Sequence, residues 1–288
     1  MAVFTSASNT GATEMDLISS IVQEELVYSA KLRPTIKDVS AMASKGIKTI
    51  DLPRFDTHFS NPAAQNPDGA TATTPQTLDF AVDTITLDEW RTLPYEIPDR
   101  VSRQSMISLE AELAKAAGKT MGRYIDEDII AQLRLASASA PDHRIQLTGT
   151  GNVLITLSDV TEARRLLNEA NVAEDDRFLL ISPVQEKTIL DLDNFRNADQ
   201  YGSDSSRVSG EIGQLYGFRV IVHNALADAE AIAYQRDAVA MAVQQEVRFE
   251  TRRANLNLQK TEYAFSMGWG VSVLEQGVKQ VLLNATGT

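Results

Sequence analysis

The 288-residue chain contains no cysteine, which excludes disulfides and thiolate metal sites. It has no apolar run near the ~18 residues of a membrane span, and its start lacks the basic-then-apolar pattern of a signal peptide. Basic residues are the minority, 27 against 39 acidic ones, with a net charge of −12. This balance argues against a dedicated nucleic-acid-binding protein, but not against one that surrounds nucleic acid. We therefore expect a chain that is soluble when made and is stabilised by packing or assembly.

Motifs that carry enzyme chemistry are also missing. No Gly-x-Ser-x-Gly elbow surrounds any serine. The histidines His58, His143 and His223 lie in three separate contexts, so we interpret them as structural or surface residues rather than parts of a triad. The acidic run Asp126–Asp128 falls in a helical pattern, where adjacent side chains point in different directions, so we interpret it as a solvated helix face.

Two segments look like ligand-binding loops only in part. The glycines of Thr148–Gly151 are not accompanied by a P-loop lysine, so a simple turn is expected. Asp191, Asp193 and Asn194 look like part of a calcium loop, but the required glycine and terminal glutamate are missing. The sequence therefore predicts no catalytic residue, no cofactor and no metal.

A small basic cluster near the C-terminal end has two interpretations of equal weight. Arg248, Arg252 and Arg253 would face DNA or a subunit boundary, or they would form salt bridges on a solvated strand edge. Contacts with DNA would be made to phosphates and would be independent of sequence.

The N-terminal third of the chain predicts an arm and a long hairpin. A helix is expected over residues 14–33, ended by Pro34. A strand over 47–52, which stops at Pro53, and a strand over 77–87 flank a turn-rich polar stretch. Such a hairpin has little core of its own, and a loop of this length is usually functional. The apolar residues that we expect to be buried in an assembly are Leu52, Phe55, Phe59, Leu78 and Phe80.

The clearest helix is expected over residues 102–137, with Ser102 as its N-cap. Gly118 and Gly122 would permit a bend or close packing near its centre. Its apolar stripe consists of Met106, Leu109, Leu113, Ala117, Met121, Tyr124 or Ile125, Ile129 and Leu133.

A compact α/β unit is expected over residues 151–225. Ser158 or Asp159 would cap its first helix, and a second helix would start at Pro183. Its buried strands are expected at 177–181 and 218–222, and later strands at 231–234, 239–243, 247–250 and 270–274.

The order of these parts and two local segments resemble the Hong Kong 97-type major capsid proteins of tailed phages. The segment Phe178–Pro183 is similar to the family's strand-to-helix step, and Gly210–Asn224 to its recurrent glycine-containing turn and strand, where Gly213 and Gly217 would supply tight turns before Phe218. The resemblance implies an α+β fold. Its parts would be an N-terminal arm (1–46), an extended β-hairpin E-loop (47–101), a P-domain with a long spine helix (102–150), an α/β A-domain (151–229) and returning strands that complete the A- and P-domains (230–288).

The resemblance also implies a structural function without catalysis. The chain would assemble with itself, as pentamers and hexamers, into an icosahedral virion shell around double-stranded DNA, in the cytoplasm of a host bacterium. A portal and possible cement proteins are implied partners, and no membrane is involved. The chain lacks the long charged N-terminal region that serves some members as a fused scaffold, so a separate scaffolding protein is expected. No lysine occurs from residue 49 through 114, so the hairpin lacks the amine that some members use for cross-linking.

Two other classes of protein remain open. An encapsulin-type nanocompartment shares the fold but encloses protein cargo, generally with a shorter hairpin. A soluble α/β hydrolytic enzyme would need a pocket with convergent polar groups, for which the sequence offers no motif.

Overall fold

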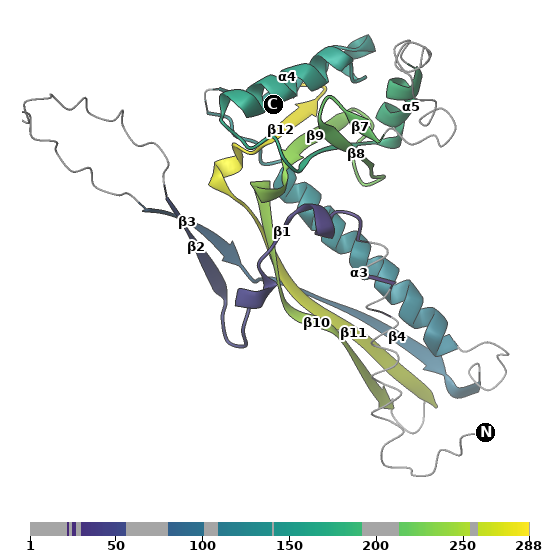
Figure 1. The fold of residues 1–288 in the computed structure, drawn as a ribbon. Coiled ribbons are helices and arrows are strands. Elements are labelled where there is room, and N and C mark those ends of the chain that lie inside the picture. Colours follow the sequence, from purple (N-terminus) through teal and green to yellow (C-terminus); the bar gives the residue numbers. More distant parts are fainter. Residues whose placement is uncertain are drawn as a thin grey trace, which may run out of the picture.

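The computed structural model describes residues 22, 25–26, 30–55, 80–100, 109–139, 141–191, 213–253 and 259–287. A long helix lies along a four-stranded sheet, a compact α/β unit sits at one end, and a two-stranded hairpin projects to the side (Figure 1). The helices with described bounds include α3 (Leu109–Leu133), α4 (Leu157–Glu169) and α5 (Pro183–Asp191). The strands are β1 (Lys37–Asp38), β2 (Thr49–Phe55), β3 (Phe80–Thr86), β4 (Glu89–Pro98), β5 (Arg144–Gln146), β6 (Arg177–Ile181), β7 (Gln214–Leu215), β8 (Phe218–Val222), β9 (Glu230–Gln235), β10 (Val239–Arg253), β11 (Lys260–Val273) and β12 (Gln280–Asn284).

The apolar stripe of α3 is the centre of the subunit core. Met121, Ile125 and Ile129 are fully buried, whereas Tyr124 is exposed, which decides between the two candidates of the stripe. Leu113 is only partly buried at the margin of the same cluster. The helix is confirmed over Leu109–Leu133, and its predicted continuation to residue 137 is wrong because the chain leaves the helix after Leu133. Ser102, Met106 and the side chain of Leu109 lie outside the described residues.

Gly118 allows the N-terminal segment, the chain before β1, to cross α3 with the two backbones in close contact. A Cβ atom at this position would lie 2.7 Å from the carbonyl oxygen of Val22 and 2.8 Å from the Cβ of Glu25. The close packing predicted for this glycine is therefore confirmed. The predicted helix 14–33 is too long at its C-terminal end, because residues 30–32 are not helical and Arg33–Thr35 form a 3-10 turn.

The four-stranded sheet, in the order β1-β10-β11-β4, packs one face against α3. The sequence predicted two short strands, 239–243 and 247–250, where the structure has the single strand β10. Register shifts between Val243, Gln245 and Arg248 interrupt the alternation and explain the error. β11 begins at Lys260, ten residues before the predicted strand.

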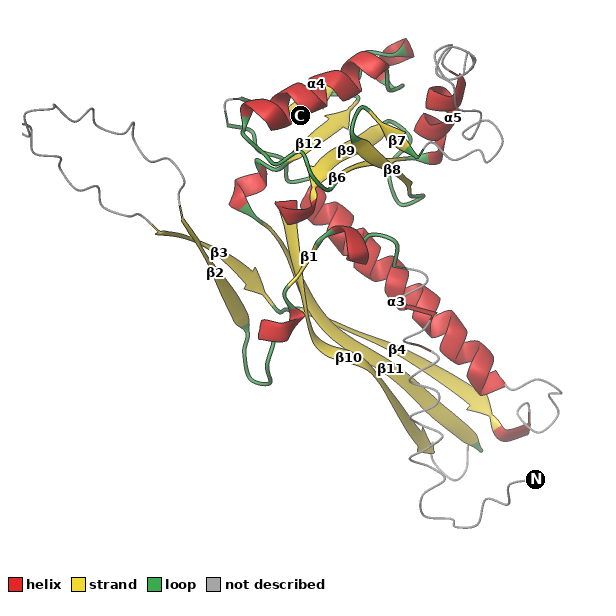
Figure 2. Ribbon diagram, in the orientation of Figure 1, coloured by secondary structure: helices red, strands yellow, loops and turns green. Residues whose placement is uncertain are grey.

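The α/β unit is a six-stranded sheet in the order β5-β12-β9-β6-β8-β7 (Figure 2). One face packs under α4 and α5, and the other joins the α3 cluster, so every residue of β6 and β9 is buried. Pro183 begins α5 as predicted. The cap predicted for α4 is wrong: Thr156 is the N-cap, and Asp159 is the third helical residue of a capping box with it.

The segment predicted as the hairpin, 47–101, is divided between two sheets. β2 and β3 pair antiparallel from Thr49 and Thr86 to Phe55 and Phe80. β4 instead pairs with β11 in the long sheet. The predicted end of the first strand at Pro53 is wrong, because each strand of a two-stranded sheet has a free edge, where the missing N–H of proline costs no ladder hydrogen bond.

Replacing Ile129 by alanine tests the assignment of the α3 stripe. The side chain is fully buried in the main cluster, so its truncation should lower the free energy of unfolding by about 2–5 kcal/mol. Lys119→Ala, on the exposed face of the same helix, should change it by less than about 0.5 kcal/mol. Denaturant unfolding of the unassembled subunit measures both, and equal effects would contradict the assignment.

Candidate assembly surfaces and the junction of the subunit

The base of the hairpin packs against the body of the subunit at a small apolar cluster, which we call the seat. Ile50 and Ile85 are buried in a small cluster with Val39, Ala240, Ala242 and Leu274, and Leu52 packs half-buried beside it. The opposite face of the hairpin exposes Val82, which is 55% accessible. The hairpin thus buries one face only at its base.

Gly270 lets the hairpin base approach the sheet. A Cβ atom there would lie 2.2 Å from the backbone oxygen of Thr86, and the hydroxyl of Ser272 donates to the backbone oxygen of Thr84 at 3.2 Å. The strand β3 therefore rests directly on β11, which fixes the direction in which the hairpin leaves the subunit (Figure 1).

Of the five hairpin residues predicted to serve assembly, the structure describes the surroundings of one. Leu52 lies in the seat and is therefore partly used within the subunit. Phe55 and Phe80 are paired in the strand register, but their side chains are outside the described residues, as are Phe59 and Leu78 entirely.

The face of the long sheet opposite α3 carries an exposed tryptophan. Trp90 of β4 is 55% exposed, and its ring lies against Gly268 of β11, where a Cβ atom would come within 2.6 Å of the ring. Neighbouring positions carry small or charged side chains, such as Ser266 and Arg248. The sequence analysis did not single out this surface, because an isolated tryptophan gives no periodic signal.

The basic cluster is paired with carboxylates. Arg248 lies 2.9 Å from Glu250, Arg252 lies 2.7 Å from Glu262, and Arg253 lies 3.0 Å from Asp99. These pairs are the salt bridges that the strand-edge interpretation expects. Exposed pairs of this kind contribute little to stability.

The glycine turn predicted in the α/β unit has the expected backbone. Gly213 and Gly217 have φ values of 57° and 88°, the left-handed region that glycine adopts without strain. Phe218 follows as a fully buried residue under α4 and α5. Gly210 lies outside the described residues.

The solvated face predicted for the acidic run on α3 is confirmed for Glu127, which pairs with Arg123 on the surface, but is wrong for Asp126. Asp126 is completely buried, and Asp128 accepts a hydrogen bond from the indole N–H of Trp269 at 2.9 Å. Burial raises the pKa of Asp128, although that hydrogen bond opposes the shift. The error arose because the sequence does not show which parts of the chain cover each side of α3. The N-terminal segment and the α/β unit cover the side that carries Asp126.

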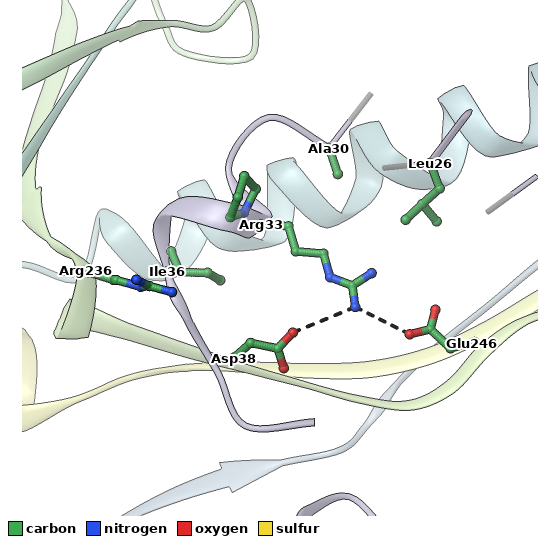
Figure 3. Close-up of a pocket in the computed structure, with 8 residues that line it drawn as sticks. Leu26, Ala30, Arg33, Ile36, Asp38, Arg236 and Glu246 are labelled. Carbon is green, nitrogen blue, oxygen red and sulfur yellow. Dashed lines mark hydrogen bonds and ion pairs between the residues drawn. The ribbon is translucent and has the colours of Figure 1, made fainter. Parts of the chain in front are cut away.

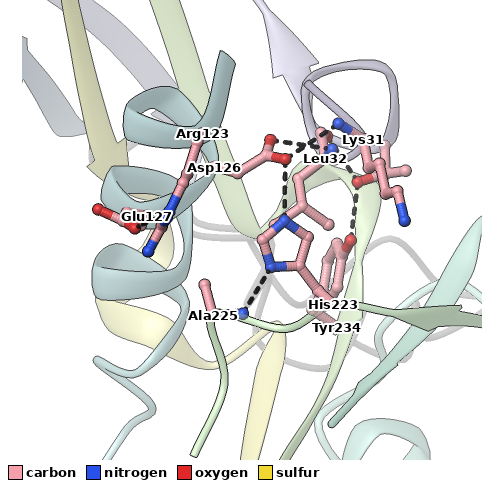
Figure 4. A network of polar contacts seen from close by, with 9 residues as sticks. Lys31, Leu32, Arg123, Asp126, Glu127, His223, Ala225 and Tyr234 are labelled. Atoms are coloured by element: carbon pink, nitrogen blue, oxygen red, sulfur yellow. Dashed lines mark hydrogen bonds and ion pairs between the residues drawn. The ribbon is translucent and has the colours of Figure 1, made fainter. Parts of the chain in front are cut away.

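Asp126 joins three parts of the chain (Figure 4). Its carboxylate accepts hydrogen bonds from the backbone N–H groups of Lys31 at 3.0 Å and Leu32 at 3.1 Å, and from Nε2 of His223 at 3.0 Å. Nδ1 of His223 accepts from the backbone N–H of Ala225 at 3.1 Å, which places the imidazole proton on Nε2.

Further polar contacts reinforce the same junction. Arg134, near the end of α3, forms a bidentate pair with Glu230 at 2.6 and 2.8 Å. Thr35 donates to the carbonyl of Leu32, and the hydroxyl of Tyr234 lies 2.7 Å from Thr35. Burial raises the pKa of Tyr234 far above its usual range, so this phenol stays protonated and donates to Thr35.

The described residues include no cluster of three or more histidine or acidic side chains that could hold a metal ion. His143 is buried, with Nδ1 3.1 Å from the carbonyl of Gln280, and His223 is engaged as above, so both are structural as predicted; His58 is not described. Thr148–Gly151 forms the expected turn, with Gly151 in the left-handed region. Asp191 ends α5, and Asp193 and Asn194 are not described.

A groove of about 650 Å³ lies between the N-terminal segment and β10 (Figure 3). Leu26, Ala30 and Ile36 form apolar parts of its lining. Across it, Arg33 lies 3.4 Å from Glu246 and 3.8 Å from Asp38. Its lining among the described residues holds ion pairs but no histidine or nucleophile next to a base, which is not the arrangement of a hydrolytic site. No helix in the described part of the chain has the length and apolar character needed to cross a membrane.

Comparison with known proteins decides what kind of subunit this is. A family model described as phage capsid protein matches residues 22–277. The chain belongs to the phage capsid protein family. It is a structural component of the virion shell, and the prediction that it is not an enzyme is confirmed by that membership.

Individual relatives agree with the family. The major capsid protein of Escherichia phage T5 is 26% identical over 126 residues, which span 42% of this chain but only 28% of that protein. A structure from Mycobacterium phage Che8 superimposes with a TM-score of 0.70 at 19% identity, covering 88% of this chain and 90% of that one. The capsid of cyanophage P-SCSP1u gives 0.71 at 17%, covering 88% and 87%. A virus-like particle from Pyrococcus furiosus gives 0.62 at 10%, covering 94% and 99%. The mixed α+β capsid fold of the Hong Kong 97 type is thus confirmed.

Replacing Gly270 by alanine tests the hairpin seat. The new methyl group would overlap a backbone atom that has no rotamer to escape into, so we expect a destabilisation of about 1–3 kcal/mol and a hairpin displaced from its seat. Ser272→Ala removes one long hydrogen bond and should leave the hairpin in place. A cryo-EM map of each variant measures the hairpin angle, and an undisturbed hairpin in the Gly270→Ala map would contradict this account.

Proposed function

We propose that this chain is the major capsid protein of a tailed phage, which assembles as pentamers and hexamers into an icosahedral head around double-stranded DNA. The observation that carries the proposal is the hairpin. It buries one face at its base, exposes Val82 on the other, and is joined at its far end by a turn-rich segment with two phenylalanine or leucine residues. Apolar side chains of that kind gain about 25 cal/mol per Å² when a neighbouring subunit covers them.

Within this proposal the named parts of the subunit have distinct roles. The α/β unit would act as the A-domain around local symmetry axes, and α3 with the long sheet as the P-domain. The hairpin and the N-terminal segment would lie across neighbours, in heterologous contacts that close into a shell when their geometry closes. A portal, a separate scaffolding protein and a possible cement protein would be the further partners, and DNA would be held without sequence specificity.

An encapsulin-type compartment is the second candidate, because the fold alone does not separate it from a phage head. The phage capsid family match over residues 22–277 favours the head. Electron microscopy of particles from infected or expressing cells distinguishes the two. Large angular shells with DNA support the proposal, whereas small shells filled with protein would favour the compartment, and discrete monomers would contradict both.

Deleting residues 58–76 tests the role of the hairpin tip. The described seat of the hairpin contains none of these residues, so the subunit should stay soluble and folded but form no stable shell. Circular dichroism and electron microscopy measure the two properties. Particles of normal size and stability from the deleted chain would contradict an assembly role.

We also expect a shell without covalent cross-links. No lysine occurs from residue 49 through 114, a range that includes both strands of the hairpin, and the chain has no cysteine. Mature particles boiled in detergent should therefore run as one band near 31.6 kDa. A ladder of covalent oligomers would contradict this, and Lys45 and Lys48, exposed at the base of the hairpin, would then be the first candidates.

A further inference from the structure

We propose that Asp126 is the positioning residue that sets the angle between the α/β unit, the N-terminal segment and α3, and thereby the size to which the shell closes. The inference rests on the proposed function only in that it requires a closed shell. It concerns a junction inside the subunit, which could not be predicted from the acidic run in the sequence.

The geometry of the carboxylate is specific for three donors. One oxygen of Asp126 accepts from Lys31 and His223, and the other accepts from Leu32. Both oxygens act only as acceptors, which is the pattern of an ionised carboxylate. Because the group is completely buried, no water can replace a donor that leaves.

The N-terminal segment has turned out of its helix to meet this carboxylate. The N–H groups of Lys31 and Leu32 bind Asp126 instead of continuing a helical ladder. Three residues after Leu32 the chain reaches Thr35, which contacts Tyr234 of β9. The segment is therefore fixed at the point where it passes from α3 to the α/β unit.

The α/β unit meets α3 in the shared apolar cluster, by a hydrogen bond from Gln280 to the carbonyl of Gln132, and through the segment 223–230. At one end of this segment His223 donates to Asp126, and at the other Glu230 pairs with Arg134, the first residue after α3. Each of these side chains also accepts an N–H from within the loop, His223 from Ala225 and Glu230 from Ala227. The loop is thus internally bonded, and its polar contacts with Asp126 and Arg134 hold the α/β unit in its orientation on the helix.

Asparagine cannot replace Asp126. If its NH₂ group faces Leu32, two donors meet. If the NH₂ group faces Lys31, two donors meet again, and His223 could accept from it only by moving its proton to Nδ1, against the N–H of Ala225. Every orientation leaves a buried donor without an acceptor.

The test compares Asp126→Asn with two variants of the same helix. Glu127→Gln changes the adjacent carboxylate, which pairs with Arg123 on the surface at 2.8 Å. Ile129→Val lowers stability through the core without touching the junction. Hydrogen exchange of the unassembled subunit reports on the Lys31 and Leu32 amides, and electron microscopy gives the distribution of particle diameters.

In Asp126→Asn, we expect the amide hydrogens of Lys31 and Leu32 to exchange at least about tenfold faster than in the wild-type chain. We also expect this variant to form open sheets or particles of mixed diameter. Glu127→Gln and Ile129→Val should both retain the wild-type diameter. Wild-type diameters from Asp126→Asn, or the same spread from Ile129→Val, would overturn the proposal. Failure of the wild-type chain to form shells would instead count against the proposed function.

A second pair of variants covers the case in which Asp126→Asn does not fold. Glutamine at position 223 places an amide N–H near the position of the imidazole Nε2 and keeps the donor to Asp126, whereas leucine removes it. His223→Gln should retain the wild-type diameter, and His223→Leu should broaden it. Equal diameters from the two variants would overturn the proposal.

Discussion

The packing of one apolar stripe on α3 supports the whole subunit. Met121, Ile125 and Ile129 contribute to a single cluster that includes Phe265 of the long sheet and Ile232 of the α/β unit. Two sheets with different strand orders therefore share one core, and neither can move away from the helix without opening it. The charged junction at Asp126 lies on the same helix, so apolar packing sets the distance between the parts while the buried hydrogen bonds set their angle.

Features encoded by local periodicity could be predicted from the sequence. The stripe of α3, the buried strand Arg177–Ile181 and the start of α5 at Pro183 each depend on residues close together in the chain. The single strand β10 was predicted as two short strands, because its register shifts interrupt the alternation of apolar and polar residues that indicates a strand. The cap of α4 was misplaced because Asp159 also belongs to a capping box, as its third helical residue rather than its cap.

The junction could not be predicted, since its partners are separated by more than ninety positions in the chain. A buried aspartate and a solvated one look the same in a helical pattern, and only the segment that crosses the helix decides between them. Local signals were also weak at the base of the hairpin. The hairpin was recognised from its turns and its length, but its seat depends on Gly270, a residue on a strand far from it in sequence.

The two tryptophans of the chain lie in opposite environments. Trp269 is buried and hydrogen-bonded to Asp128, whereas Trp90 lies next to Gly268 and is 55% exposed on the face of the sheet opposite α3. The emission of Trp269 is therefore set within the subunit, while that of Trp90 depends on what covers this face. The chain thus carries a natural optical reporter: a blue shift during shell formation would come from Trp90, and would give the rate at which this surface is covered without any attached label.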